Sequence, residues 1–437
     1  MHSKLGKKKS KSKLKSKLSS KSKLKTKLKV KSKLKSKSKA KSRYAIKLLF
    51  ILLLLIIEVT EDFNKIKTVP NKYCKIKIGI ISEHFSQNIG NNLLKYAMFI
   101  KIKELGFEPQ IVGHLIRGNN ISELNKSINI RLINSSFSEI NKNDYDILMV
   151  NSDQVWRKGN LFCFDIGFLN FSKNWNITKF IYGASLGSET WRYGRNENVV
   201  IKELLKQFKG ISVREKGTIK LVQNHFNITP ILVADPTLLI DKKYYLDLIK
   251  DYKNEFFVNE SYIFAYNVER MLPMEIFIRE SAEMLNYEFY ICNTYDKDYL
   301  KKFIYGIYNC KAVITNSYHG ILFSIIFGKP FVAFNPKHRG NDRFKTLKEV
   351  FGLQKRIVSE KNPPNISLLI EPLDIDMNII DKLKKQSNNY LNKILGVELK
   401  KMKNNNNAQK LSFKEKFFLF LNHITKGVLH LKKKFKL

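Results

Sequence analysis

Hydrophobic runs that end in polar residues alternate with helical patterns through the centre of the chain. The segment KIKIGII at residues 75–81 is typical of a buried strand, and the helical pattern LLKYAMFIKIKELG follows it at residues 93–106. The run PQIVGHL at residues 109–115 then completes a strand–helix–strand unit. Further strands are predicted at YDILMVNSD (145–153), KFIYGAS (179–185), GISVRE (210–215), ILVADP (231–236), SYIFAYNV (261–268), YEFYICNT (287–294) and KAVITNS (311–317).

Strands with polar carboxyl ends that alternate with helices predict an α/β fold with parallel sheets, whose ligands lie at the carboxyl ends of the strands. The chain has 437 residues, a length that suits about two folded domains with extensions. We therefore expect two Rossmann-like lobes that face a cleft. The N-terminal lobe is assigned to residues 73–240 and the C-terminal lobe to residues 241–400.

The first 43 residues differ in composition from the rest of the chain. They contain 19 Lys and one Arg and no acidic residue, and they supply 20 of the positive charges behind a formal net charge of +41. Repulsion between neighbouring charges predicts a disordered tail over residues 1–43. The tail is either a low-complexity extension without a partner or a segment that contacts anionic lipid or nucleic acid.

An unbroken apolar run, Leu48–Ile57, follows this tail. The segment 44–59 approaches the length of a transmembrane helix if Lys47 extends toward the lipid headgroups. A signal-peptide core and a soluble hydrophobic helix are alternatives, but the basic residues ahead of the run favour a retained signal anchor. The sequence thus predicts a single-pass membrane protein, with residues 60–72 as a linker and the side of the folded body undetermined.

The C-terminal residues 401–437 combine an Asn-rich linker with a basic amphipathic helix. Apolar residues from Phe413 to Leu431 recur on one face of this helix, with lysines outside that face. We expect the helix to lie either on a membrane surface or on the folded body.

The cysteines indicate neither a disulfide framework nor a metal site. Cys74, Cys163, Cys292 and Cys310 are scattered without a CxxC pair or His-rich spacing. The expectation is free, partly buried thiols and no bound metal.

Several predicted strands end in polar residues that suit a binding site. The turn with Asn88, Gly90 and Asn91 opens a helix, where N–H groups and the helix dipole favour an anion, although it lacks GxGxxG spacing. Asp153 follows a strand as either a cap or a site carboxylate. Arg214 also ends a strand, where its guanidinium binds either a substrate anion or a neighbouring acid.

The segment TNSYHG at residues 315–320 takes a buried strand into a buried helix. His319 lies at the start of that helix, with Ser317 just before it and Gly320 allowing close backbone approach. A histidine in this position is a candidate acid or base as well as a structural residue.

Two further stretches carry charge at the end of predicted strands. Asp235 in ILVADP is expected to cap the following turn. The stretch KHRGNDRF, with Arg339 and Arg343, suits an anion clamp or an exposed basic loop.

The order and wording of these segments resemble the polysaccharide pyruvyl transferase family over roughly residues 76–355. The resemblance implies two lobes arranged as in GT-B glycosyltransferases. It also implies transfer of a pyruvyl group from phosphoenolpyruvate to two sugar hydroxyls, giving a cyclic ketal and phosphate without a further cofactor. The matching segments are NIGNNLLKYA, DILMVNSDQVW, IYGASLGS, ISVRE, ILVADPTLLI, VITNSYHGILFSIIFGKPF and DRFKTLKEVFGL.

This resemblance implies that His319 transfers a proton and that Arg214 binds phosphoenolpyruvate; Asp153 is the second catalytic candidate. Better-studied members carry Arg-x-His, whereas this chain has Ser317 two residues before the histidine, so Arg343 or Arg339 is expected to supply the missing cation. The full set of predicted substrate-binding residues is Arg214, Arg343, Arg339, Ser317, Gly320, Asn88, Gly90 and Asn91.

The leading hypothesis is a membrane-anchored pyruvyl transferase whose acceptor is a polysaccharide or glycolipid. One alternative is a glycosyltransferase-like enzyme that uses a nucleotide sugar. Another is a non-catalytic body that tethers a membrane or nucleic acid through its basic tail and C-terminal helix.

Overall fold

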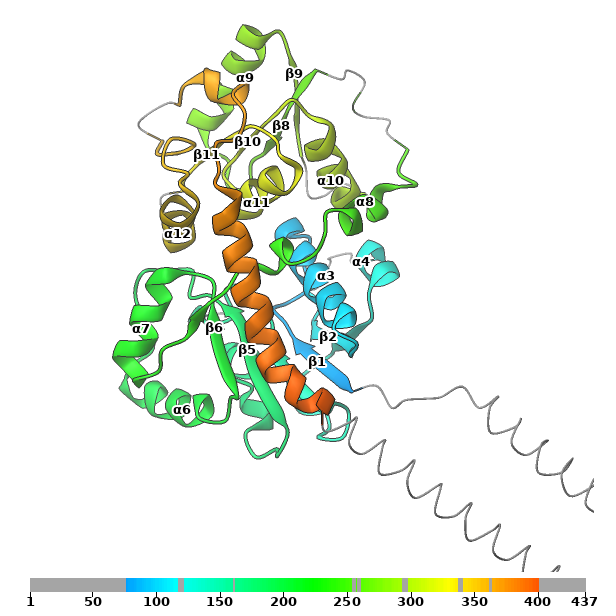
Figure 1. Ribbon diagram of the computed structural model, residues 1–437, viewed down its shortest axis with the longest axis vertical. Helices are drawn as coiled ribbons and strands as arrows, with labels where there is room; N and C mark the ends of the chain where they lie inside the picture. The colour runs from blue at the N-terminus through cyan, green and yellow to red at the C-terminus, as the bar shows by residue number, and fades with distance from the viewer. Residues whose placement is uncertain are drawn as a thin grey trace, which may run out of the picture. The chain divides into compact units, whose positions relative to one another are not determined.

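The computed structural model describes residues 76–116, 122–159, 162–253, 257, 261–292, 298–336, 341–360 and 364–400. They all lie within one compact unit, Lys75–Leu437. This body holds two parallel sheets, which confirms the expected α/β fold (Figure 1).

The N-terminal lobe is built on a seven-stranded sheet with the order β3-β2-β1-β4-β5-β6-β7. Four residues of β1 are fully buried, because a parallel sheet in the middle of an α/β lobe is covered on both faces. The strands are β1 (Lys77–Ile81), β2 (Glu108–His114), β3 (Ile130–Ile133), β4 (Ile147–Val150), β5 (Thr178–Ala184), β6 (Gly210–Val213) and β7 (Ile231–Leu232). The helices are α3 (Ile89–Glu104), α4 (Ser122–Ser127), α5 (Cys163–Phe168), α6 (Arg195–Leu205) and α7 (Lys216–Phe226), with short 3-10 turns at Phe137–Glu139, Asn170–Ser172 and Pro236–Leu238.

The C-terminal lobe is built on a five-stranded sheet with the order β12-β11-β10-β8-β9. Its central strand β10 pairs in parallel with both β8 and β11, and all four of its residues are buried. The strands are β8 (Tyr262–Tyr266), β9 (Glu288–Ile291), β10 (Ala312–Thr315), β11 (Phe331–Phe334) and β12 (Ile357–Val358). The helices are α8 (Lys243–Ile249), α9 (Leu272–Leu285), α10 (Tyr299–Asn309), α11 (Tyr318–Phe327) and α12 (Asn341–Phe351), with a 3-10 turn at Ile366–Leu369.

A long helix over residues 377–400 runs back from the C-terminal lobe across the N-terminal lobe (Figure 1). Its Tyr390 hydroxyl donates to the carbonyl of Ile181 in β5, at 2.6 Å. Its Ser387 hydroxyl accepts from the N–H of Ala234, at 2.8 Å. Although the predicted division assigned these residues to the C-terminal lobe, this helix joins the two lobes.

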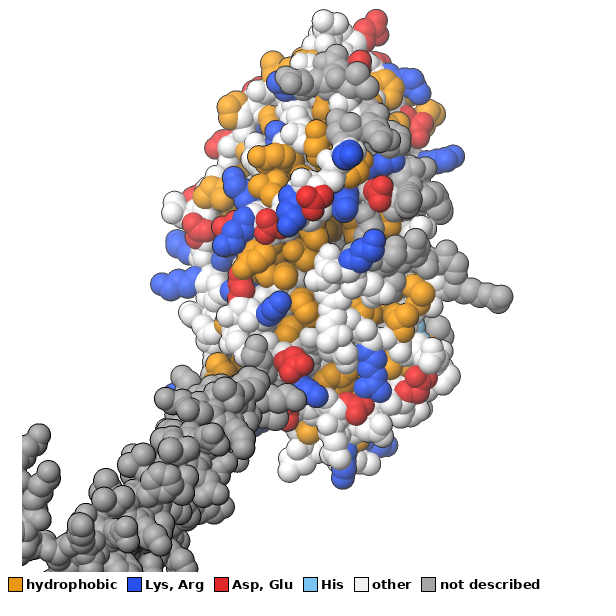
Figure 2. Space-filling view, turned by 90° about the vertical axis from the view of Figure 1, so that its right-hand side faces the viewer, with side chains coloured by type: hydrophobic (Ala, Val, Ile, Leu, Met, Phe, Trp, Pro, Cys, Tyr) orange, Lys and Arg blue, Asp and Glu red, His pale blue; other side chains and the backbone are white. Residues whose placement is uncertain are grey.

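On the face of the body shown in Figure 2, positive and negative side chains are intermixed. Lys and Arg side chains alternate with Asp and Glu there, with apolar patches between them. Charges of both signs are normal for a soluble surface, so this face does not present the single-sign field that attracts nucleic acid.

The predicted membrane localisation is corrected. Among the described residues, no helix combines the length and the apolar character needed to cross a bilayer. This finding overturns the expectation of a single-pass membrane protein. The basic tail of residues 1–43, the apolar segment 44–59, the linker 60–72 and the C-terminal segment 401–437 lie outside the described residues.

Truncation of Leu391 is expected to destabilise the fold by about 2–5 kcal/mol, because a buried leucine replaced by alanine leaves a cavity. Leu391 lies in the helix that joins the lobes and is completely buried. The measurement is the free energy of unfolding in denaturant of Leu391→Ala. Asn392→Ala, at the exposed next position, is the control and should change it by less than about 0.5 kcal/mol. Equal stability of the two variants would contradict this packing role.

Candidate active site

A polar cavity lies where the carboxyl ends of strands from both sheets meet. Parallel sheets place their ligands at this edge, because the loops that follow the strands are free to carry polar side chains. The N-terminal lobe contributes Glu83, Asn88, Asp153 and Gln154, and the C-terminal lobe contributes Tyr266, Val268, Glu269, Asn316, Ser317, Tyr318, His319, Pro336, Arg343 and Phe344.

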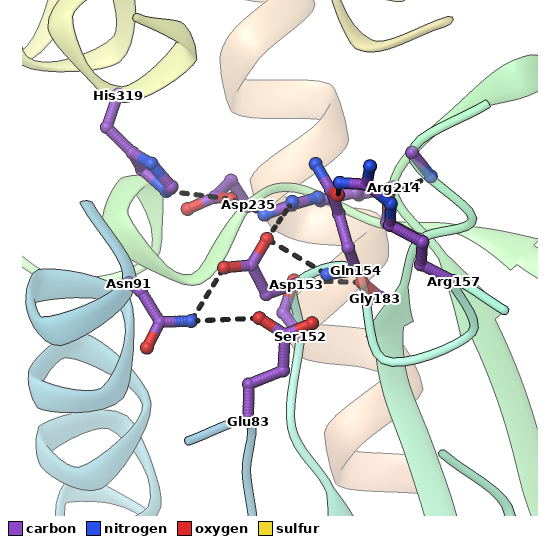
Figure 3. Close-up of polar contacts among 12 residues, drawn as sticks. Glu83, Asn91, Ser152, Asp153, Gln154, Arg157, Gly183, Arg214, Asp235 and His319 are labelled. Carbon is purple, nitrogen blue, oxygen red and sulfur yellow. Dashed lines mark hydrogen bonds and ion pairs between the residues drawn. The ribbon is translucent and has the colours of Figure 1, made fainter. Parts of the chain in front are cut away.

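The buried guanidinium of Arg214 lies at the centre of the polar cluster beside this cavity (Figure 3). Its Nη2 contacts Asp153 Oδ1 at 2.7 Å, its Nη1 contacts Asp235 Oδ2 at 2.7 Å, and its Nε contacts Glu215 Oε1 at 3.2 Å. The Arg214 side chain is completely buried. Each of its nitrogens already faces a carboxylate in this conformation, so its predicted contact with phosphoenolpyruvate stays a prediction.

Asp153 and Asp235 are held ionised by this cluster. Burial alone raises the pKa of a carboxyl, but Arg214, with Arg343 and His319, lowers the pKa of Asp153 well below its usual range. His319 and Arg214 likewise outweigh burial at Asp235 and bring its pKa to about 2. Asp235 also accepts from the N–H of Thr237 at 3.0 Å, so it caps the turn as expected and serves the site as well.

The backbone at Asp153 is strained. Its φ of 106° lies in the region that favours glycine. The carboxylate accepts from the N–H of Gln154 at 2.9 Å and from the Asn91 side chain at 2.7 Å, in addition to its pair with Arg214. These contacts hold the strained residue at the wall of the cavity.

Glu83 is a site residue that the sequence analysis missed. Asn91 Nδ2 bridges it to Asp153, at 3.4 Å from Glu83 Oε2 and 2.7 Å from Asp153 Oδ2 (Figure 3). Burial raises the pKa of Glu83 to about 8, and the charge of Asp153 adds to the rise. Lys95 donates to Asn91 Oδ1 and completes the group. Glu83 is therefore mainly protonated at neutral pH, beside a carboxylate that stays ionised.

His319 extends from the first turn of α11 toward Asp235 (Figure 3). Its Nε2 lies 3.7 Å from Asp235 Oδ2, an ion-pair distance rather than a hydrogen bond, and has no hydrogen-bond partner among the described residues. Gly90, in the first turn of α3, lies against the other side of the ring: a Cβ there would lie 2.0 Å from Nδ1. The two lobes therefore meet at this imidazole.

Arg343 places a second guanidinium at the cavity. Its Cζ lies 5.3 Å from the ring centre of Tyr318, and that of Arg214 lies 5.1 Å from the same centre. Within the described ranges Arg343 forms no ion pair, and its Nε lacks a hydrogen-bond partner. Burial lowers its pKa, and the charge of Arg214 adds to this effect. Arg339 lies outside the described residues.

The remaining predicted residues have visible structural roles. Asn88 accepts from the N–H of Asn91 at 3.0 Å and caps α3. Ser317 accepts from the N–H of Gly320 at 3.3 Å and caps α11. Asn88 and Ser317 also line the cavity, whereas Gly320 packs on Thr315. Their substrate contacts stay predictions.

No cysteine is among the described residues that line this cavity. Cys163, Cys292 and Cys310 are free thiols, and Cys74 lies outside the described residues. In the part of the chain that the structure describes, no group of three His, Cys, Asp or Glu side chains is arranged to hold a metal ion.

Two parallel α/β sheets with a polar cavity at their facing carboxyl ends define the GT-B-like class of two-lobed folds. The family model for polysaccharide pyruvyl transferase matches residues 88–338, more than half of the chain. The chain belongs to this family, and the family is one of transferases.

The solved structures to which the chain is similar are distant in sequence. The structure of UDP-GlcNAc 2-epimerase from Neisseria meningitidis bound to UDP-GlcNAc is 10% identical, with a TM-score of 0.46 over 74% of this chain and 100% of that one. The S. aureus MnaA–UDP structure is 12% identical, with a TM-score of 0.44 over 72% and 92%. Acinetobacter baumannii MurG is 11% identical, with a TM-score of 0.36 over 74% and 99%. The search of curated proteins gave no match.

The stability of the fold is expected to fall as the pH rises from about 5 to 8. Glu83 and Glu215 have folded-state pKa values of about 8 and about 7, above the ordinary value of 4.5. In this window the unfolded chain has released protons that the folded chain still holds, so raising the pH favours unfolding. Thermal unfolding across this range is the measurement. Glu83→Gln, which mimics the protonated acid, should flatten the slope; the same slope in both proteins would contradict the raised pKa.

Replacement of Gly90 by alanine is expected to displace the His319 ring, since the added methyl group would overlap Nδ1. Imidazole resonances of His319 in NMR spectra should shift in Gly90→Ala. The control is Gly194→Ala at the N-cap of α6, where φ is −81° and an added Cβ would make only an ordinary contact with Glu197 Oε2 at 3.5 Å. An unshifted His319 in Gly90→Ala would contradict the contact between the lobes.

Proposed function

We propose that this protein transfers a pyruvyl group from phosphoenolpyruvate to two hydroxyls of a sugar in a polysaccharide or glycolipid. The observation that carries the proposal is that Glu83 of one lobe and His319 of the other line one cavity, in a chain of the pyruvyl transferase family. The reaction needs proton transfer in both directions, and these side chains are suited to it.

The proposed chemistry begins with a proton added to C3 of phosphoenolpyruvate, which becomes a methyl group. The first sugar hydroxyl then bonds to C2 and loses its proton. The bond from C2 to the phosphate oxygen breaks, phosphate leaves, and the second hydroxyl bonds to C2 to close the ketal ring. Of the two hydroxyl protons, one is accounted for by the methyl group and the other leaves with phosphate, so the atoms balance.

Glu83 is the proposed acid toward C3, because its raised pKa keeps a proton available at neutral pH. His319, whose Nε2 lies 3.7 Å from the ionised Asp235, is the proposed base toward the hydroxyl in its neutral form. Asp153, predicted as a catalytic residue, acts here through Glu83 as a positioning residue. Its permanent charge, transmitted across the Asn91 bridge, disfavours ionisation of Glu83.

Arg343 is the proposed contact for the negative charge of the donor. Its guanidinium is partly buried and stacked on Tyr318, and it has no carboxylate pair in the described part of the chain. Arg343 would thus supply the positive charge that the arginine of Arg-x-His supplies in other family members, since this chain has Ser317 at that position.

Loss of either proton-transfer group is expected to reduce turnover by about 10²–10⁴-fold. The measurement is phosphate release from phosphoenolpyruvate with a panel of sugar acceptors, for His319→Ala and Glu83→Gln. In the parent protein, activity should fall as the pH rises through about 8, where Glu83 loses its proton; Glu83→Gln should lack this limb.

Glu108→Gln, at an exposed position at the start of β2, is the matched control and should retain full activity. Circular dichroism of each variant separates loss of chemistry from loss of fold. Full activity in both His319→Ala and Glu83→Gln would contradict the proposed roles. Release of nucleotide from nucleotide sugars, with no phosphate from phosphoenolpyruvate, would contradict the proposed reaction.

A further inference from the structure

A second, smaller cavity lies beside the first at the carboxyl ends of β4 and β5. The described residues that line it are Trp156, Arg157, Lys158, Leu186, Gly187, Ser188, Thr190 and Arg192. None of them is acidic and three are cationic. The first cavity has a more acidic lining: among the described residues, Glu83, Asp153 and Glu269 line it together with Arg343.

Two of these cations lack a carboxylate partner. Arg157 is half-buried, and its Nη1 donates to the neutral amide oxygen of Gln154 at 3.1 Å. Neither Arg157 nor Arg192 forms an ion pair with any residue in the described ranges. Lys158, by contrast, is paired with Glu197 at 2.6 Å. The cavity therefore offers two guanidinium groups to an incoming anion.

Gln154 connects the two cavities. Its side chain lines the first cavity and accepts the hydrogen bond from Arg157 of the second (Figure 3). Gly187 presses against it from the other side: a Cβ at this position would lie 2.6 Å from Gln154 Cδ, and its φ of 63° also favours glycine. A ligand that spans both cavities would pass this side chain.

The lining of the second cavity is mainly polar. Trp156 and Leu186 border it but are buried, so they expose little apolar surface to a ligand. Ser188 and Thr190 bring hydroxyl groups to the lining. Hydroxyl groups beside guanidinium groups suit a sugar that bears an acidic group.

We propose that this second cavity binds a sugar residue of the acceptor that bears a carboxylate or a phosphate, next to the sugar that receives the pyruvyl group. The proposal rests on the proposed function. It assigns the cavity to the acceptor because the reacting carbon of the donor belongs between Glu83 and His319 in the first cavity. Arg157 and Arg192 hold the acidic group, and the acceptor reaches past Gln154 into the first cavity.

The test is a binding titration that needs no turnover, with glucuronic acid and glucose 6-phosphate as acidic probes and glucose as the neutral match. The parent protein should bind each acidic probe at least about tenfold more tightly than glucose, since a hydrogen bond to a charged group contributes that much. Arg157→Gln combined with Arg192→Gln should remove this preference. The matched control, Arg195→Gln with Lys202→Gln, loses the same charge from exposed positions of α6 outside the cavity and should keep it.

Several outcomes would overturn the assignment. One is equal binding of glucose and the acidic probes by the parent protein, or no binding of any of them. Another is a cavity variant that keeps the acidic preference, or a control variant that loses it. A third is a cavity variant whose affinity for phosphoenolpyruvate falls while that for the acidic sugars does not, because the cavity then serves the donor. Absence of phosphate release with this acidic preference intact would refute the proposed reaction and leave the subsite standing.

Discussion

The buried guanidinium of Arg214 is the constraint on which the rest of the site depends. Arg214 follows β6, and its side chain is fully buried. It pairs with carboxylates at the ends of β4 and β7 and with that of its neighbour Glu215. A buried charge is costly unless it is paired, and removal of one partner leaves the others uncompensated. The ends of three strands are thereby held together at one point of the N-terminal lobe.

This pairing divides the nearby carboxyl groups into two kinds. Asp153 and Asp235 are in direct contact with Arg214 and stay ionised, whereas burial raises the pKa of Glu215, the third contact, to about 7. Glu83 is one step further away, shares the Asn91 amide with Asp153, and is half-buried; loss of solvent around its carboxyl raises its pKa, so it keeps its proton to a higher pH. The ionised Asp235 in turn faces His319 of the other lobe. Arg214 thus keeps two carboxylates ionised at the same cavity, one beside Glu83 and one facing His319.

The fold was largely predictable because buried parallel strands with polar ends leave a strong local pattern. The grouping of Asp153, Arg214 and His319 also followed, since all three come directly after strands. Glu83 has the same position after β1, and that signal could have identified it. Its raised pKa could not be predicted, because it depends on burial and on Asp153, which reaches it from another strand. Every nitrogen of Arg214 faces a carboxylate, and this too could not be predicted, because two of these carboxylates come from residues distant in the sequence. The two-residue strands β7 and β12 are too short to show a period, and the lobe-joining helix gives no sign in the sequence of which lobe it will cover.

Glu83 carries a proton at neutral pH because loss of solvent around its carboxyl raises its pKa and the ionised Asp153 beside it adds to the rise. The most direct measurement is a ¹³C NMR titration of protein labelled at the glutamate side-chain carboxyl carbon, with the Glu83 signal assigned from its absence in Glu83→Gln. A carboxylic acid signal is expected at pH 7, with a titration near pH 8. A Glu83 signal that titrates near the ordinary value of about 4.5 would contradict it.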